Sequence, residues 1–319
     1  MARTAAIGEQ DFSKIIENNY LYVDKTDFIK EWWENGDTVT LITRPRRFGK
    51  TLGMHMLYCF FSMNYAQRSD LFQNLSIWKE EKYRKLQGTY PVIFLSFANV
   101  KPDTYEEAYD SICRIIAREY RRHISIMEDN CFLQADREQF YKIINGNAAV
   151  SDICASLNQL SEYLYDFYRK RVLILLDEYD TPMQEAYAKG CWKELTTFMR
   201  KLMNASFKTN PFLERGIMTG ITRISRESIF SDLNNLAVIT SASRLYETSF
   251  GFTEDETFNL LKEFGMQERM TDVKRWYDGF CFGACCHIYN PWSVINFLKF
   301  KELPSCQRLF ENNRMHDGQ

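Results

Sequence analysis

The sequence predicts an α/β fold in which helices flank a central, mostly parallel β-sheet. Residues 38–43 form a β-branched apolar stretch, which a tight loop and an apolar helix follow. A second apolar stretch, residues 171–176, ends in two adjacent carboxylates, and a third lies between them at residues 91–97. Strands that alternate with helices in this way form parallel sheets that helices cover on both faces.

The composition is that of a soluble globular protein. The chain has 319 residues, of which 45% are hydrophobic and 26% are charged, so it can bury a large core. The net charge of −2 provides no general attraction to nucleic acids or to anionic membranes. The 9 cysteines are scattered and odd in number, which fits reduced thiols better than a disulfide framework. Because neither a signal peptide nor an apolar run of membrane-spanning length is visible, we expect a cytoplasmic protein without a membrane segment.

The order of strand, loop, Gly-Lys-Thr and helix at residues 38–51 is the context of a phosphate-binding loop. We expect Lys50 to reach the β- and γ-phosphates of a nucleotide and Thr51 to ligate Mg²⁺. The N–H groups of Phe48 and Gly49 would cradle phosphate oxygens, and the helix N-terminus adds its positive dipole end.

The loop departs from the full phosphate-binding pattern at two positions. Arg44 stands where that pattern has glycine, and Pro45 has no backbone N–H to donate. Arg46 and Arg47 would supply the positive charge that the missing glycine geometry cannot. An ordinary strand–turn–helix is the alternative interpretation, and Gly-Lys-Thr by itself does not decide between the two.

The two carboxylates favour nucleotide binding. Asp177 and Glu178 follow a run that is apolar on both faces of a strand, and packing alone does not explain them. In P-loop ATPases the first such carboxylate holds Mg²⁺ and the second orients or deprotonates the attacking water. The pair of motifs, of the Walker A and Walker B kind, therefore predicts a P-loop NTPase that binds ATP with Mg²⁺. Asp180 either joins the Mg²⁺ shell or caps the following turn, and we favour the cap.

Periodicity and capping residues predict the remaining elements up to residue 248. The expected helices are two short ones within residues 9–34, then residues 50–63, a short one near 78–86, one that Thr104 and Glu107 open, one that Ser151 caps, and residues 191–207. Asp24 is a candidate cap for the second helix, and residues 124–149 form a mixed, insert-like stretch. Leu213–Gly220 and Leu236–Ile239 are the expected later strands.

The pattern changes from about Ser249. Thr253 and Glu256 form a capping box, a second helix reaches Trp276, and a hairpin-like segment precedes a last helix that ends near Phe300. The hairpin-like segment carries four residues of types that bind zinc: Cys281, Cys285, Cys286 and His287. Their spacing fits no standard zinc site, so a hairpin that carries cysteines is the favoured interpretation.

Five motifs occur in a set order: Tyr22–Thr26, Arg44–Thr51, Leu176–Asp180, Gly220–Ser225 and Tyr289–Ser293. With these motifs the chain, from about residue 8 to about residue 300, resembles the bacterial AAA-ATPase-like family. Longer members of that family carry a PD-(D/E)XK nuclease-like domain after the ATPase, so this chain resembles a shortened member. In the family, arginine already replaces the first loop glycine.

The resemblance implies an AAA-like P-loop fold with a small C-terminal helical lid. Residues 1–35 would be an N-terminal helical extension near the adenine pocket, 36–248 the ATPase core, 249–300 the lid and 301–319 an irregular tail. A polar sensor of the γ-phosphate is expected after the strand that follows the Asp-Glu strand, and three residues are candidates: Thr219, Thr222 and Arg223. For the arginine, a surface position on a loop is the alternative.

Three functions remain open. The first is slow Mg²⁺-dependent ATP hydrolysis with Lys50, Glu178 and Arg223 as catalytic residues, in a regulatory role or coupled to a nuclease-type partner. The second is a nucleotide-dependent switch with little hydrolysis, which the crowded loop favours. The third, direct nucleic-acid processing, is disfavoured because the chain has no nuclease constellation of its own. A homo-oligomer would be needed for an arginine finger supplied in trans, and the absence of an Asn-Lys-x-Asp signature favours adenine over guanine.

Overall fold

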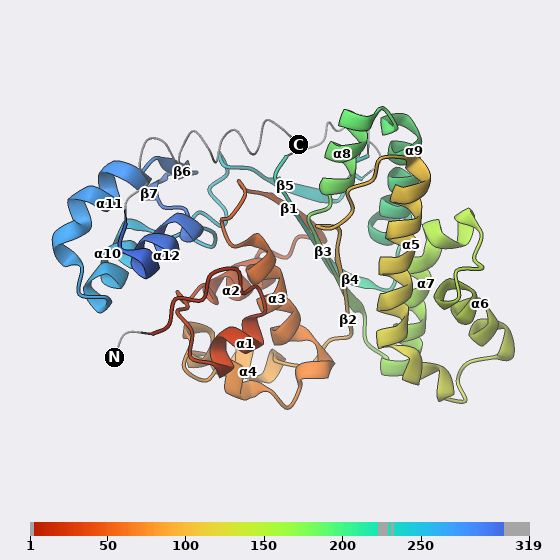
Figure 1. Ribbon diagram of the computed structural model, residues 1–319. Helices are drawn as coiled ribbons and strands as arrows, with labels where there is room; N and C mark the ends of the chain where they lie inside the picture. The colour runs from red at the N-terminus through yellow and green to blue at the C-terminus, as the bar shows by residue number, and fades with distance from the viewer. Residues whose placement is uncertain (1–2, 223–228, 231–232, 303–319) are drawn as a thin grey trace.

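Five parallel strands form the central sheet of the computed structural model, which describes residues 3–222, 229–230 and 233–302 (Figure 1). The strand order is β2-β3-β4-β1-β5, and all four pairings are parallel. The strands are β1 Val39–Thr43, β2 Val92–Ser96, β3 Val172–Asp177, β4 Leu213–Gly220 and β5 Leu236–Ile239. The expected α/β fold with a parallel sheet is confirmed.

Helices cover both faces of the sheet, in two groups that follow chain order (Figure 1). The first group is α1 Phe12–Glu17, α2 Asp27–Asn35, α3 Lys50–Phe61 and α4 Glu81–Leu86, with short 3-10 helices at Met63–Tyr65, Ser69–Leu71 and Ser76–Lys79. The second group is α5 Tyr105–Arg122, α6 Gln134–Ile144, α7 Val150–Tyr168, α8 Thr181–Lys189 and α9 Trp192–Met203, with a 3-10 helix at Ile124–Glu128 and a π-helix at Asn204–Lys208. None of the helices in the described ranges is both long enough and apolar enough to cross a bilayer.

Strand β3 shows why the sequence is apolar without alternation. Leu173 and Leu175 pack in the cluster formed with the first helix group, whereas Val172, Ile174 and Leu176 pack in the cluster formed with the second. Successive side chains of a strand point to opposite faces, and here both faces are covered. A polar residue is therefore tolerated only at the end of the strand, where Asp177 lies.

The carboxyl ends of β1, β3 and β4 lie together at one edge of the sheet. Strand β4 lies between β1 and β3, with Ile42 opposite Thr219 and Leu176 opposite Met218. The chain leaves β1 toward β2 on one side and later reaches β5 on the other side of β1. Ligands of open α/β sheets bind at the carboxyl ends of the strands, where the strand order reverses in this way.

A third apolar cluster joins the two ends of the described chain. It contains Ala5 and Leu21 from the N-terminal segment and Leu261 and Phe297 from the C-terminal part. That part comprises α10 Glu254–Glu263, a 3-10 helix Gln267–Arg269, α11 Met270–Tyr277, β6 Phe280–Phe282, β7 Cys285–Ile288 and α12 Pro291–Phe300, and we call it the lid. Figure 1 shows the N-terminal segment beside α10 and α12.

Ion pairs strengthen the contact between the N-terminal segment and the lid. Arg3 pairs with Glu263 at 2.7 Å, and Lys25 pairs with Glu256 at 2.6 Å. Glu256 also completes the expected capping box of α10, because its carboxylate accepts from the Thr253 N–H at 2.7 Å.

Two of the expected helix caps are wrong. Helix α7 begins after Ala149, whose N–H donates to the Asp152 carboxylate, so Ser151 lies inside the first turn. Helix α2 has Thr26 at its N-cap, and the Asp24 carboxylate instead accepts from the N–H groups of Thr26 and Ser76. In both cases the capping residue was misplaced because another polar contact, visible only in the fold, fixes the chain before the helix.

The expected cap at Thr104 is confirmed, since its hydroxyl accepts from the Glu107 N–H at 3.3 Å. The Glu107 carboxylate accepts from the N–H of Asp103 and not from that of Thr104. The hairpin-like segment is also confirmed as β6 and β7, which pair antiparallel.

Arg44, directly after β1, is buried and links the sheet to the lid. Its guanidinium donates to the carbonyls of Thr43, Leu245 and Tyr246 and lies 4.5 Å from the centroid of the Phe282 ring. Burial lowers the pKa of Arg44 to about 10. An arginine at this position therefore has a structural role, which a glycine cannot provide.

We expect Arg44→Ala to lower the free energy of unfolding by about 2–4 kcal/mol, because it leaves buried carbonyls unpaired and creates a cavity. Arg46→Ala is the matched control: Arg46 is exposed two residues away, and its loss should change stability by no more than about 0.5 kcal/mol. Urea unfolding of both variants measures the difference. Equal losses in the two variants would contradict the structural role of Arg44.

Candidate functional site

The loop between β1 and α3 is held in a conformation that directs it around the start of the helix. Arg47 and Gly49 both have positive φ, at 67° and 88°, and α3 begins at Lys50. Alternating left-handed residues at a helix N-terminus direct backbone N–H groups into a concave space that suits anions. Phe48, between them, turns its side chain inward and is buried.

Lys50 lies beneath this loop. Its ammonium donates to the carbonyl of Arg44 at 3.0 Å and to that of Pro45 at 2.9 Å. Burial lowers the pKa of Lys50, and the carboxylates of Glu178 and Asp177 act in the opposite direction. The lysine and the two carboxylates are therefore close enough to interact through their charges, although 127 positions separate Lys50 from Asp177 in the sequence (177 − 50).

Asp177 is fully buried at the end of β3. Its carboxylate accepts hydrogen bonds from the hydroxyls of Thr219 at 2.6 Å and Ser96 at 3.4 Å, and the Thr51 hydroxyl lies close enough to lower the pKa of Asp177. Burial raises the pKa of Asp177 above its usual value, and these hydroxyls act against that rise. The two expected Mg²⁺ ligands, Thr51 and Asp177, thus lie close together.

These two residues provide only oxygen ligands, as Mg²⁺ prefers. No three His, Cys, Asp or Glu side chains converge on a metal position within the part of the chain that the structure describes. Mg²⁺ in nucleotide sites is bound through one or two protein groups, and phosphate oxygens and water complete its shell. Thr51 and Asp177 therefore suit a metal that arrives with a polyphosphate.

Glu178 has a strained backbone. Its φ is 51°, a left-handed conformation that is uncommon for a residue other than glycine. One carboxylate oxygen accepts from the Thr181 hydroxyl at 3.1 Å, and the side chain is only half-buried. The turn directs Glu178 away from the strand interior that buries Asp177, so two adjacent carboxylates occupy different environments.

A cavity of about 600 Å³ opens at this edge of the sheet. That volume is within the range of small-molecule sites, which is roughly 300–1,000 Å³. Its lining combines the expected loop and carboxylate residues with segments far away in sequence: Ala6–Gln10, Arg46, Arg47, Gly49, Lys50, Thr51, Leu52, Glu178, Pro291, Trp292 and Ile295. Both loop arginines are exposed, and the Arg47 guanidinium lies 4.0 Å from the centroid of the Trp292 ring.

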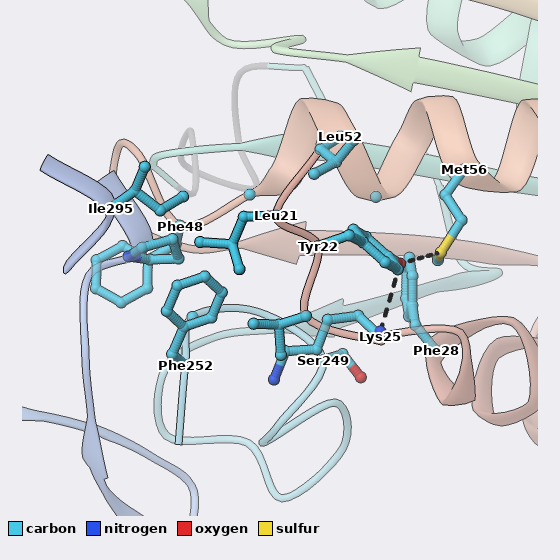
Figure 2. Close-up of a pocket in the computed structure, with 15 residues that line it drawn as sticks. Leu21, Tyr22, Lys25, Phe28, Phe48, Leu52, Met56, Ser249, Phe252 and Ile295 are labelled. Carbon is cyan, nitrogen blue, oxygen red and sulfur yellow. Dashed lines mark hydrogen bonds between the residues drawn. The ribbon is translucent and has the colours of Figure 1, made fainter. Parts of the chain in front are cut away.

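A second, apolar pocket of about 90 Å³ adjoins this cavity and shares Gly49, Leu52, Pro291 and Ile295 with it. Figure 2 shows Leu21, Phe252 and Ile295 pointing toward one another across it, with Tyr22 and Leu52 alongside. The N-terminal segment, α3 and the lid each contribute a wall. The two spaces together offer a charged compartment beside an apolar one.

The phosphate-loop candidate is attached to the lid. The Phe48 ring lies 4.7 Å from the Phe280 ring and 5.4 Å from the Phe282 ring, centroid to centroid. The Phe48 carbonyl accepts from the Gly251 N–H at 3.0 Å. Phe48 therefore contributes a contact between loop and lid, in addition to the N–H group that the sequence suggested.

The sensor candidates lie in different places. Thr219 donates to Asp177, as described above. The Thr222 hydroxyl donates a hydrogen bond to the Asp180 carboxylate at 2.9 Å, and Thr222 does not line the cavity. Arg223 lies outside the described residues.

Asp180 is the N-cap residue of α8, as expected of a cap of the following turn, but its carboxylate takes no part in the capping. One carboxylate oxygen instead accepts from the N–H groups of Ile221 and Thr222, at 2.9 and 2.8 Å. Gly220 leaves the necessary space, because a Cβ there would lie 2.6 Å from the other Asp180 oxygen. The buried carboxylate thus joins the end of β3 to the loop after β4.

The resemblance implied that the N-terminal extension lies near the adenine pocket, but no individual residue of segment 6–10 or of α12 was predicted to line the cavity. A signal existed in the Tyr289–Ser293 motif, in which Asn290 caps α12 and Pro291 and Trp292 line the cavity. The segment 6–10 has no comparable pattern, because its position depends on the third apolar cluster.

Comparison with known proteins gives a family and one relative for this chain. A protein from Azotobacter chroococcum mcd 1, described as "Uncharacterized protein in vnfD 5'region", is 26% identical over 299 residues, which are 93% of this chain and 52% of that protein. The chain therefore spans about half the length of this relative. No solved structure matches the chain. The model of a family described as "Predicted AAA-ATPase" matches residues 6–230, which include the loop, Asp177 and Glu178. Since this match covers more than half of the chain, the protein belongs to the Predicted AAA-ATPase family.

Proposed function

We propose that the chain binds ATP together with Mg²⁺ in the cavity beside α3 and hydrolyses it slowly. The observation that supports this most directly is the meeting of four residues from two distant motifs. Lys50, Thr51 and Glu178 line one cavity, and Asp177 lies close to Thr51. Charge-bearing groups gathered in one cavity, with pKa values shifted by burial, are typical of functional sites.

In this proposal the triphosphate occupies the 600 Å³ cavity and the adenine enters the adjoining apolar pocket. The Lys50 ammonium, now bound to two loop carbonyls, would turn to the β- and γ-phosphates, which are stronger acceptors because they are charged. Arg46 and Arg47 are exposed at the same cavity and would add positive charge. The N–H groups of Phe48 and Gly49 would face phosphate oxygens.

Thr51 and Asp177 would hold Mg²⁺, which neutralises phosphate charge and orients the γ-phosphoryl group when bound. Glu178 would accept the proton of the attacking water, because its half-buried carboxylate faces the cavity and has one oxygen outside the Thr181 hydrogen bond. Arg223 or Thr222 would contact the γ-phosphate, for which the Thr222 hydroxyl would have to leave Asp180. Asp180 supports this role because it anchors the N–H groups of Ile221 and Thr222, directly before Arg223 in the sequence.

A second candidate, a nucleotide-dependent switch with little hydrolysis, is favoured by a different observation. Phe48 contacts the lid through its rings and its carbonyl, and Arg47 stacks on Trp292 of α12. A phosphate that reorganises the loop would therefore disturb the lid. Such a device could control a partner, for which a nuclease-type protein remains our proposal, or the contact between copies in a homo-oligomer.

We expect Lys50→Ala to weaken ATP binding by about 100-fold or more, because each hydrogen bond from the ammonium to a charged acceptor contributes about 1.5–3 kcal/mol. Lys170→Ala is the matched control, since Lys170 precedes β3 at the opposite edge of the sheet and lies over the Tyr90 ring. Isothermal titration calorimetry of both variants measures the dissociation constants. Equal ATP affinity in the wild type and Lys50→Ala would refute the phosphate site.

We expect Glu178→Gln to retain ATP binding but to slow hydrolysis by about 10²–10⁴-fold, the usual contribution of a general base. Single-turnover release of phosphate from labelled ATP measures this, with Glu194→Gln on the exposed side of α9 as the control. If bound ATP persists for hours in the wild type as well, the switch replaces the hydrolase as the function of this site.

We expect Asp177→Asn to stabilise the nucleotide-free protein and to abolish the Mg²⁺ dependence of ATP binding. Burial raises the pKa of Asp177, so the native state binds this proton more tightly than the unfolded chain does. Native stability should therefore fall as the pH rises from about 4 through the raised pKa, and the amide removes that fall. Thermal unfolding at pH 5 and pH 8 should show a melting temperature about 1–3 °C higher for the variant at pH 8. If Asp177→Asn melts at a lower temperature than the wild type at pH 8, the buried charge of Asp177 does not destabilise the native protein.

A further inference from the structure

The lid hairpin places two exposed thiols opposite each other. Strands β6 and β7 pair antiparallel, with Phe282 opposite Cys285 on either side of a two-residue turn. Farther along, Phe280 pairs with Ile288, so β7 contains one extra residue in this interval. Cys281 therefore lies across from Cys286 and His287. Both Cys281 and Cys286 are exposed.

This position in the hairpin suits a disulfide. In an antiparallel hairpin, the pair beside a two-residue turn exchanges backbone hydrogen bonds, and the next pair does not. In a regular ladder the Cα atoms of such a pair are about 4.5 Å apart, and a disulfide spans roughly 4.4–6.8 Å, so a Cys281–Cys286 bond tolerates some widening by the extra residue of β7. The Cys281 thiol lies close enough to Cys286 to affect its pKa. Cys285 is half-buried and packs against the apolar cluster of α2 and α3, away from this pair.

The opposite face of the same hairpin contacts the candidate phosphate loop. Phe280 and Phe282 pack on Phe48, and the Arg44 guanidinium lies over the Phe282 ring. The turn is fixed as well, because Gly283 donates its N–H to the Ser241 carbonyl at 2.8 Å. A covalent bond across β6 and β7 would therefore stiffen an element that directly supports the loop.

We propose that Cys281 and Cys286 form a redox site, which closes reversibly to a disulfide by exchange with a small-molecule disulfide such as oxidised glutathione. We further propose that this bond changes the nucleotide affinity of the loop, a step that rests on the proposed ATP binding. One protein thiolate attacks the small-molecule disulfide, forms a mixed disulfide and releases one reduced thiol. The other protein thiol then attacks the mixed disulfide and releases the second. Two protein thiols are oxidised, and one small-molecule disulfide is reduced to two thiols.

The environment of the pair sets the expected rate. The nearby Cys281 thiol raises the pKa of Cys286, so little of it is thiolate at neutral pH. Exchange should therefore become faster as the pH rises from 7 to 9, because the thiolate is the nucleophile.

Differential alkylation tests the site without any nucleotide. The protein is equilibrated with oxidised and reduced glutathione at pH 7.5, free thiols are blocked with N-ethylmaleimide, and disulfides are reduced and labelled with iodoacetamide. The tryptic peptide of residues 276–299 contains all three hairpin cysteines, and fragmentation distinguishes them. We expect iodoacetamide, the second label, to modify Cys281 and Cys286 together. In Cys281→Ser and in Cys286→Ser, the cysteine that remains should lose this label, because it has no partner for a disulfide.

Two controls make the assignment specific. Cys285→Ser should still form the bond, and so should Cys131→Ser, which removes an exposed thiol from another part of the fold. A second label on Cys285 with Cys286, or no second label at any ratio of oxidised to reduced glutathione, would overturn the proposal.

Calorimetry with ATP then tests the effect on the loop. We expect the oxidised and reduced forms of the wild type to differ in ATP affinity by about fivefold or more, at the lower end of typical coupling between sites. The difference should disappear in Cys281→Ser treated in the same way. Equal affinities despite a mapped disulfide would overturn the coupling. Absence of ATP binding in both redox states would count against the proposed ATP site and leave the mapped dithiol unaffected.

Discussion

Burial opposes charge on both members of the Lys50–Asp177 pair, and the rest of the site depends on how the fold offsets that cost. Burial lowers the pKa of the lysine and raises that of the aspartate, so both groups are displaced toward their neutral forms. Two loop carbonyls solvate the ammonium, and the hydroxyls of Thr51 and Thr219 solvate the carboxylate. Such an arrangement is costly in a protein without a ligand, and a metal–polyphosphate complex would supply the opposite charges that it lacks.

The crowded loop has a structural explanation. Where the common pattern has glycine, Arg44 turns inward and joins β1 to the linker before the lid and to the hairpin. Gly251 permits the close packing of the loop on the hairpin, because a Cβ at this position would lie 2.5 Å from a methyl group of Ile288 and 3.0 Å from the Phe48 ring. These contacts restrict the conformation of the loop and fix it to the lid. The same residues are therefore compatible with hydrolysis and with switching.

The cavity exists because three parts of the chain close around one edge of the sheet. The start of α3 supplies Lys50 and Thr51, the residue after β3 supplies Glu178, and residues 6–10 and α12 supply the outer wall. The third apolar cluster and the Lys25–Glu256 ion pair keep the N-terminal segment and the lid together. A ligand at this edge would contact all three parts, so its binding and the position of the lid are physically connected.

The sequence by itself determined the elements whose signals are local. The apolar run ending at Asp177, the strand Leu213–Gly220 and the capping box of Thr253 with Glu256 all depend on neighbours within a few residues, and the structure has them as expected. The proximity of Thr51 and Asp177 was also predictable, because parallel strands bring their carboxyl ends to one edge. The roles of Asp180, Asp24, Arg44 and Phe48 were not, because each side chain binds distant partners, which lie between 41 positions away (Ile221 from Asp180, 221 − 180) and 238 positions away (Phe282 from Arg44, 282 − 44). Only the tertiary structure decides such choices, since a polar or aromatic side chain binds the partner that the packed strands and helices bring within reach.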